Sequence, residues 1–174
     1  MLNFVDFQVA FPRLNSLKLS RLPKVLHLWS ENLESNKVFT KLQSLEISEC
    51  SKLQKLLLSS WHLENLWDLE VSSCHELINL LTLSTSESLV NLRRMKIVDC
   101  KMIQEIIQLQ VGEEAKDCIV FKYLWYLRLD CLPSLTSWMK WWVLIIYLVL
   151  ASLDLWIILK HQTLINYFIE IVVT

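Results

Sequence analysis

The sequence has few of the residues that ligand sites and loops usually require. It contains one glycine, Gly112, and three prolines in 174 residues. A phosphate-cradling loop or a dinucleotide fingerprint needs several glycines for tight turns and close backbone approach. The net charge of −1 provides no electric field that would attract nucleic acid. We therefore expect no cofactor and no nucleic-acid partner.

Targeting and catalytic signatures are also missing. Residues 1–10 lack a basic start and a long apolar stretch, so we expect no secretory signal and a cytoplasmic protein with reduced thiols. The five cysteines form no CxxC pair and no cluster with histidine, which argues against a metal site. No nucleophile or metal signature includes any of the four histidines, which are His27, His62, His75 and His161. We expect a protein that is not an enzyme.

One apolar frame, by contrast, recurs five times between residues 11 and 138. Counted from the first leucine of each copy, its positions are −3, 0, +3, +5, +8, +11 and +14. The zero positions are Leu14, Leu42, Leu66, Leu92 and Leu124. No frame position in any copy is polar, although only 53% of the residues are hydrophobic, so the match is not due to chance. The chain is predicted to be a repeat protein.

The spacing and the text of the copies indicate leucine-rich repeats. The steps of 28, 24, 26 and 32 residues bracket the period of that class, and each copy reads LxxLxLxx(L/C). Positions +3 and +5 alternate with polar neighbours, as a strand with one buried face requires. We predict an α/β-type repeat solenoid, a short horseshoe with a parallel concave sheet of about five strands. Cys50, Cys74 and Cys100 share position +8, where we expect small buried side chains rather than ligands.

Positions +2, +4 and +6 are predicted to face away from the core and to form the concave surface. The candidate protein-binding residues on it are Lys18, Glu46, Asp68, Glu70, Arg94, Lys96, Tyr126 and Arg128. In-register strands are expected to set Lys18 beside Glu46 and Glu70 beside Lys96. Arginine and aromatic residues dominate interface hot spots. The basic and aromatic end is therefore the preferred contact patch, with Arg93, Arg94, Lys96, Trp125, Tyr126 and Arg128. The alternative is that these charges only solvate an exposed sheet.

Longer phrases resemble a particular family. They are FPRLNSLKLSRLPKVLHLW, FTKLQSLEISECSKLQKLL, LVNLRRMKIVDCKMIQEII and, after an acidic insertion, IVFKYLWYLRLDCLPSLTSW. Over residues 11–138 the chain is similar to the C-terminal repeats of plant disease resistance proteins of the coiled-coil, nucleotide-binding, leucine-rich repeat class. The resemblance implies a non-catalytic module that senses a pathogen effector or a guarded host protein and restrains the nucleotide-binding switch domain. The phosphate-binding loop and coiled coil of that class are missing here.

The last part of the chain, residues 139–174, leaves the frame. Residues 141–159 carry Asp154 as their only charge and are long enough to cross a bilayer as a helix. We expect an apolar helical tail after a lead-in (1–10) and the repeats (11–138). Three interpretations stay open for it: a membrane anchor, a helix packed over the end of the solenoid, or non-native translated sequence. The alternative functions are accordingly a membrane-anchored repeat scaffold or a truncated, non-functional fragment.

Overall fold

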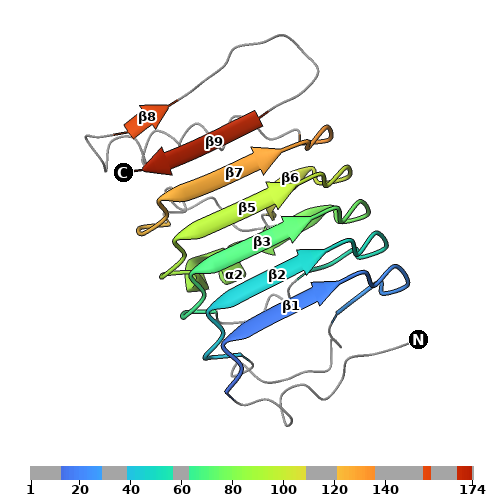
Figure 1. Cartoon of the computed structure of the whole chain (residues 1–174), viewed down its shortest axis with the longest axis horizontal. Helices are drawn as coiled ribbons and strands as arrows, with labels where there is room; N and C mark the ends of the chain where they lie inside the picture. The colour runs from blue at the N-terminus through green and yellow to red at the C-terminus, as the bar shows by residue number, and fades with distance from the viewer. Residues whose placement is uncertain are drawn as a thin grey trace.

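The computed structural model describes residues 13–28, 39–56, 63–108, 121–135, 155–157 and 168–173. Five short parallel strands lie side by side in register (Figure 1). They are β1 (Ser16–Ser20), β2 (Ser44–Ser48), β3 (Asp68–Ser72), β5 (Arg94–Val98) and β7 (Tyr126–Asp130). Each pairs residue by residue with the same frame position of the next repeat, so that Leu17, for example, lies opposite Leu45. The predicted parallel sheet of about five strands is confirmed.

Two tight turns in each repeat explain why apolar frame positions lie three residues apart before and after the strand. In the second repeat, the Leu42 amide donates to the Phe39 carbonyl over 2.9 Å, and the Leu53 amide donates to the Cys50 carbonyl over 3.0 Å. The first turn joins positions −3 and 0, and the second joins +8 and +11. The same bonds recur in later repeats, as between Leu124 and Phe121. Because each turn spans three residues, its two ends both face the core, which explains the apolar spacing before and after each strand.

The core contains nearly all of the described frame positions. Leu45, Leu69 and Met95 at position +3 are at most 1% exposed. Cys50, Cys74 and Cys100 are fully buried, as predicted for position +8, and each thiol donates to the carbonyl two residues earlier. Leu14, Leu19, Leu22 and Leu135 are only partly buried and lie in the terminal repeats. Phe11 and Trp138 lie outside the described residues.

Backbone hydrogen bonds also join the repeats before each strand begins. The carbonyl at position +1 accepts two amides of the following repeat: the Trp67 carbonyl accepts from Arg93 and Arg94, both over 2.9 Å. The Arg93 carbonyl accepts in the same way from Trp125 and Tyr126, over 3.0 and 3.2 Å. The first residue of each new strand is therefore placed by backbone atoms, whatever side chain it carries.

A left-handed residue ends every strand of the parallel sheet. The backbone φ at position +7 lies between 53° and 58° in all five repeats, at Arg21, Glu49, Ser73, Asp99 and Cys131. None of these residues is glycine, for which this conformation is least costly. In the first four repeats the amide of this residue donates to the last strand residue of the next repeat, over 3.0–3.1 Å. This sharp turn was not predicted from the sequence.

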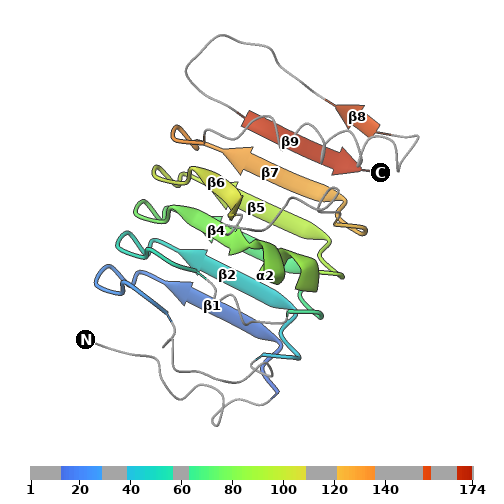
Figure 2. The same cartoon turned by 180° about the vertical axis from the view of Figure 1, so that it is seen from behind.

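The back of the sheet is covered by the returning segments (Figure 2). Strands β4 (Asn79–Thr82) and β6 (Glu105–Gln108) pair in parallel there, and single bridges extend the ladder through Lys55 to His27. Helix α2 (Leu83–Ser88) follows β4 and begins at a Thr82 cap. Its buried Ser88 hydroxyl accepts from the Leu63 amide over 3.1 Å and donates to the Thr85 carbonyl over 2.7 Å. The helix lies in the returning segment of the third repeat.

The tail differs from the expected helix in its described parts. Strand β9 (Phe168–Val173) pairs antiparallel with β7, and β8 (Leu155–Ile157) pairs antiparallel with β9. A strand inside 141–159 contradicts a continuous helix there; residues 141–154 and 158–159 lie outside the described residues. The physical reason is that β7 presents an edge of unpaired backbone groups, and FIEIVV is rich in β-branched residues that favour a strand. Among the residues that the structure describes, no helix could span a membrane.

Candidate protein-interaction surface

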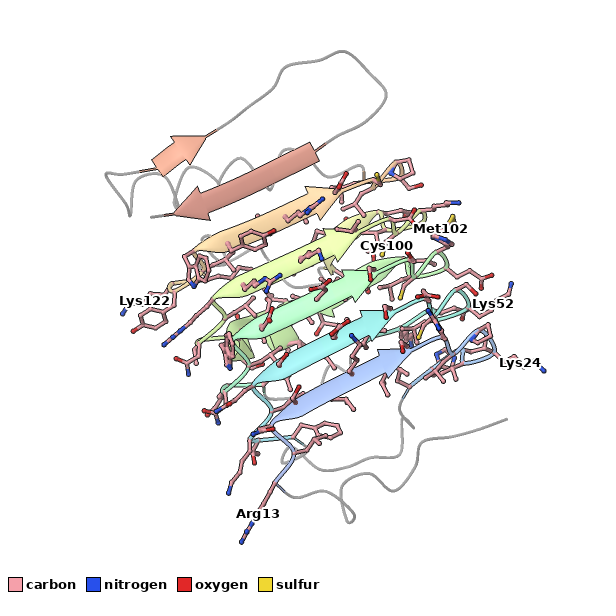
Figure 3. The ribbon with its side chains drawn as sticks, viewed as in Figure 1. Arg13, Lys24, Lys52, Cys100, Met102 and Lys122 are labelled. Atoms are coloured by element: carbon pink, nitrogen blue, oxygen red, sulfur yellow. The ribbon has the colours of Figure 1, made fainter. Side chains whose placement is uncertain are left out.

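The surface of interest is the face of the parallel sheet opposite the core, which we call the open face. It consists of the outward side chains of β1, β2, β3, β5 and β7, which are turned toward the viewer in Figure 3. In β2, β3, β5 and β7 these side chains are half-buried, because neighbouring strands press them together. All eight residues predicted for protein binding belong to this face.

Position +4 forms a row of charges across the open face. The Lys18 ammonium lies 2.6 Å from the Glu46 carboxylate, and Lys96 lies 2.6 Å from Glu70. Both pairs follow from the predicted register. The register also places like charges opposite each other, Glu46 beside Glu70 and Lys96 beside Arg128. Charge therefore changes along the face, from acidic at β2 and β3 to basic at β5 and β7.

Arg94 connects the acidic and the basic parts. Its guanidinium lies 3.8 Å from Asp68 and 3.7 Å from Glu70 on β3, and also 5.2 Å from the centre of the Tyr126 ring on β7. A planar guanidinium can pair with carboxylates and stack on an aromatic ring, which an ammonium does less well. These contacts hold Arg94 and Tyr126 in place without a ligand.

Asp68 of the open face has one carboxylate oxygen whose hydrogen bonding is incomplete. Its Oδ1 atom is buried and has no hydrogen-bond partner among the described residues, while the other oxygen faces Arg94. Burial raises the pKa of the Asp68 carboxyl, although the nearby Arg94 lowers it in part. A buried acceptor without a donor costs free energy. A donor from a partner would remove that cost.

Arg128 pairs within its own strand, with Asp130 over 3.0 Å. Its neighbour at position +4 on β5 is the like-charged Lys96. On its other side, Arg128 lies opposite Glu170 of β9 in the register of the sheet. The basic end of the open face therefore meets the tail strands, which the sequence did not reveal.

The structure divides the predicted basic and aromatic patch between two surfaces. Arg94, Lys96, Tyr126 and Arg128 belong to strands of the open face, whereas Arg93 and Trp125 precede them, in the turns. We call this border, where the strands begin, the leading edge, and the border where they end the trailing edge. Figure 3 shows Lys122 at the leading edge and Lys24 and Met102 at the trailing edge. Trp125 touches Tyr126 edge to face, with ring centres 6.1 Å apart.

No group of three histidine, cysteine or acidic side chains comes together within the described ranges to hold a metal ion. Burial raises the pKa of the Cys100 thiol to about 11, so it is protonated at neutral pH and a poor nucleophile. His75 lies 3.9 Å from Asp99 at the trailing edge, and Ser73 donates to the same carboxylate over 3.1 Å. Ser73 and His75 thus both face the Asp99 carboxylate, in a cluster of surface polar contacts.

Comparison with known protein families decides what kind of repeat this is. The family described as "Plant disease resistance protein RPS2-like, leucine-rich repeats" matches residues 3–64 and 59–141. The chain belongs to this family. A search of curated proteins and a search of solved structures give no significant match.

Membership in the RPS2-like leucine-rich repeat family supports a coarse function. Repeats of this kind are generally non-catalytic protein-interaction modules, and the family is one of plant defence. The match covers all five frame copies and stops within the first residues of the apolar tail. The family therefore accounts for the parallel sheet and not for β8 and β9.

Proposed function

We propose that the chain is the ligand-sensing or autoinhibitory module of a plant immune receptor, and that its open face is the contact surface. The partner is a pathogen effector, a guarded host protein or the nucleotide-binding switch domain of a receptor. The observation that carries the proposal is the Asp68 carboxylate, whose buried Oδ1 has no donor among the described residues. It lies beside Arg94, which is already held by Tyr126.

The ordered side chains of Arg94 and Lys96 favour tight binding for an entropic reason. Ordering a long side chain at an interface costs about 0.5–1.5 kcal/mol, and the ion pairs of Arg94 and Lys96 meet that cost before a partner arrives. Arginine and tyrosine are also the residues that most often carry binding energy. A partner donor that reaches Asp68 would add a hydrogen bond to a charged acceptor. The open face is thus preorganised around β3, β5 and β7.

The test uses the full chain, expressed in leaf tissue with the nucleotide-binding switch domain of a receptor of the same class. Co-purification measures binding. We expect Asp68→Ala and Tyr126→Ala to reduce recovery of the switch domain roughly tenfold, as for interface hot spots. Ile78→Ala is the control, because Ile78 is exposed at the trailing edge and should leave recovery unchanged. The proposal for this partner would be contradicted if the parent chain, the Asp68→Ala and Tyr126→Ala variants and a tag-only sample all recovered the same amount of switch domain.

A further inference from the structure

Three residues of the leading edge form a row that the repeat frame does not require. Trp67, Arg93 and Trp125 occupy position +1 of three successive repeats, directly before β3, β5 and β7. Their backbones are joined by the hydrogen bonds from the Trp67 and Arg93 carbonyls. The first two repeats carry Asn15 and Gln43 at the same position. The row is therefore a fixed feature of one end of the array.

The side chains around this row are largely apolar and exposed. Trp67 and Trp125 are 42% and 45% exposed, and Val90 and Tyr123, in the same turns, are each 51% exposed. These four are the majority of the large hydrophobic side chains that are exposed within the described ranges; the others are at the trailing edge. Exposed apolar side chains that gather on one surface usually mark a binding site. Tryptophan and tyrosine add the rigid contact area typical of hot spots.

Charge separates the two edges. At the trailing edge, Arg21 pairs with Glu49 over 3.2 Å and Lys52 pairs with Glu76. At the leading edge, neither Arg93 nor Lys122 makes an ion pair with any residue that the structure describes, and Lys122 lies over the Tyr123 ring at 5.6 Å. Lys122 thus stands beside an aromatic ring, and neither cation is neutralised by a carboxylate of the described residues. Such a surface favours an acidic partner, because opposite charge across an interface both steers and selects.

We propose that the leading-edge row Trp67–Arg93–Trp125 is a docking site for an acidic amphipathic helix of a partner protein. Neighbouring strands are about 4.8 Å apart, so the row places Arg93 about 4.8 Å and Trp125 about 9.6 Å from Trp67. A helix rises about 1.5 Å per residue, so residues i+3 and i+7 of one helix face lie about 4.5 and 10.5 Å from residue i. Apolar residues at i and i+7 meet the two tryptophans, and an acidic residue at i+3 or i+4 meets Arg93.

This inference names a partner chemistry and rests on the proposed function in one respect, namely that the module binds proteins. It does not use the open face. The two surfaces adjoin where the strands begin, as where Trp125 touches Tyr126. A partner could therefore engage both, with its helix on the leading edge and a donor at Asp68. Failure of the switch-domain experiment would leave the leading-edge site standing, and the reverse also holds.

The experiment uses the full chain and two labelled synthetic helices of about 18 residues, a length above the ~12–15 at which isolated helices are marginal. One peptide has leucine at i and i+7 and glutamate at i+3 and i+4; the other has lysine in place of both glutamates. Fluorescence anisotropy measures binding. We expect the glutamate peptide to bind at least roughly tenfold more tightly, Arg93→Glu to reverse the preference, and Trp125→Ala to weaken binding of the glutamate peptide about tenfold or more.

Two matched controls lie at the trailing edge. Lys101→Glu reverses an exposed charge and Met102→Ala removes an exposed apolar side chain, and neither should change the preference. Circular dichroism and thermal melting establish that every variant is folded. Equal affinity for both peptides, or a preference that survives Arg93→Glu, would overturn the proposal. A labelled oligothymidylate is the third probe, since aromatic and cationic rows also stack bases. Oligothymidylate binding that Trp125→Ala abolishes would overturn it as well.

Discussion

The inward and outward side chains of the same five strands follow different rules. Inward, Leu69 and its neighbours at position +3 are apolar in every repeat and almost completely buried. Outward, position +4 changes sign from lysine to glutamate and back to lysine and arginine. Apolar contact is non-directional, so one residue type suits every repeat. Ion pairs depend on the neighbouring strand, so the outer residues vary while the inner ones stay constant. The fold is carried by what repeats, and specificity by what does not.

The largest effect is expected for an inward residue. Leu69 is fully buried in β3 between Leu45 and Met95. Leu69→Ala should lower the free energy of unfolding by about 2–5 kcal/mol, through lost burial and the cavity left behind. Denaturant unfolding of the full chain measures it. Val90→Ala, at an exposed position, should change stability by less than about 0.5 kcal/mol. Similar values for the two substitutions would remove the distinction between inward and outward positions.

The next largest effect is expected for a buried polar residue outside the strands of the parallel sheet. Ser88 is buried, and its hydroxyl accepts from the Leu63 amide. Ser88→Ala leaves that amide without this acceptor and should cost about 1–3 kcal/mol. Hydrogen exchange at Leu63 should accelerate at the same time. Ser84→Ala in the same helix is the control, because Ser84 is exposed and alanine is the better helix former. Unchanged exchange at Leu63 in Ser88→Ala would contradict this role.

A gain in stability is expected where a left-handed residue ends a strand. Cys131 has a φ of 54° and an exposed side chain. Cys131→Gly should stabilise the protein by about 1 kcal/mol, because glycine accepts this conformation without steric cost. Thermal melting compares it with Ser134→Gly, three residues later, which should destabilise by roughly 0.5–1 kcal/mol. If both substitutions lowered stability, or both raised it, the left-handed backbone at Cys131 would not be the source of the effect.

Outward ion pairs should matter less. The exposed Lys18–Glu46 pair should contribute about 0.2–1 kcal/mol, measured as the coupling in a double-mutant cycle with Lys18→Ala and Glu46→Ala. The coupling should fall in high salt, where the charges are screened. The half-buried Lys96–Glu70 pair serves as the comparison, since it is screened less. The prediction would be wrong if the Lys18–Glu46 coupling were as large as the Lys96–Glu70 coupling and did not respond to salt.

The smallest effect is a pH dependence at Asp68. Its pKa is raised by burial, so the folded protein favours the protonated carboxyl. The contribution of Asp68 to stability is therefore greatest below the ordinary carboxyl range and decreases as pH rises through it. Asp68→Asn should raise the melting temperature slightly at pH 7, and the difference should shrink below about pH 4. A difference that grows on acidification would mean that Arg94 outweighs burial.

The sequence revealed the inward half of the fold because apolar spacing is a direct consequence of strand alternation and of turns that span three residues. It also predicted the pairs Lys18–Glu46 and Lys96–Glu70, since register and sign suffice for direct neighbours. The diagonal reach of Arg94 toward Tyr126 depends on side-chain rotamers and was not predictable. The left-handed turns carry no glycine to mark them. Helix α2 has no apolar face that would announce it, because serine and threonine fill its buried side.

The tail shows a different limit. The apolar run over residues 141–159 is typical of a helix, yet β8 and β9 pair antiparallel at the edge of β7. The composition of the tail does not show that a strand edge is open elsewhere in the chain, because that edge exists only in the assembled sheet. The division of Arg93 from Arg94 has a similar origin. Adjacent in sequence, they lie on either side of the point where the strand begins, and a frame that counts residues does not mark that point.

The paired bonds from each carbonyl at position +1 have an evolutionary consequence. The Gln43 carbonyl holds the amides of Trp67 and Asp68 as the Trp67 carbonyl holds those of Arg93 and Arg94. An extra copy of residues 66–91, inserted in frame after residue 91, would bring its own position +1 carbonyl and its own two amides. The repeats on either side of it would then make the same backbone hydrogen bonds as before. Array length can therefore change by whole units through unequal recombination, leaving selection free to act on the outward side chains of each new copy.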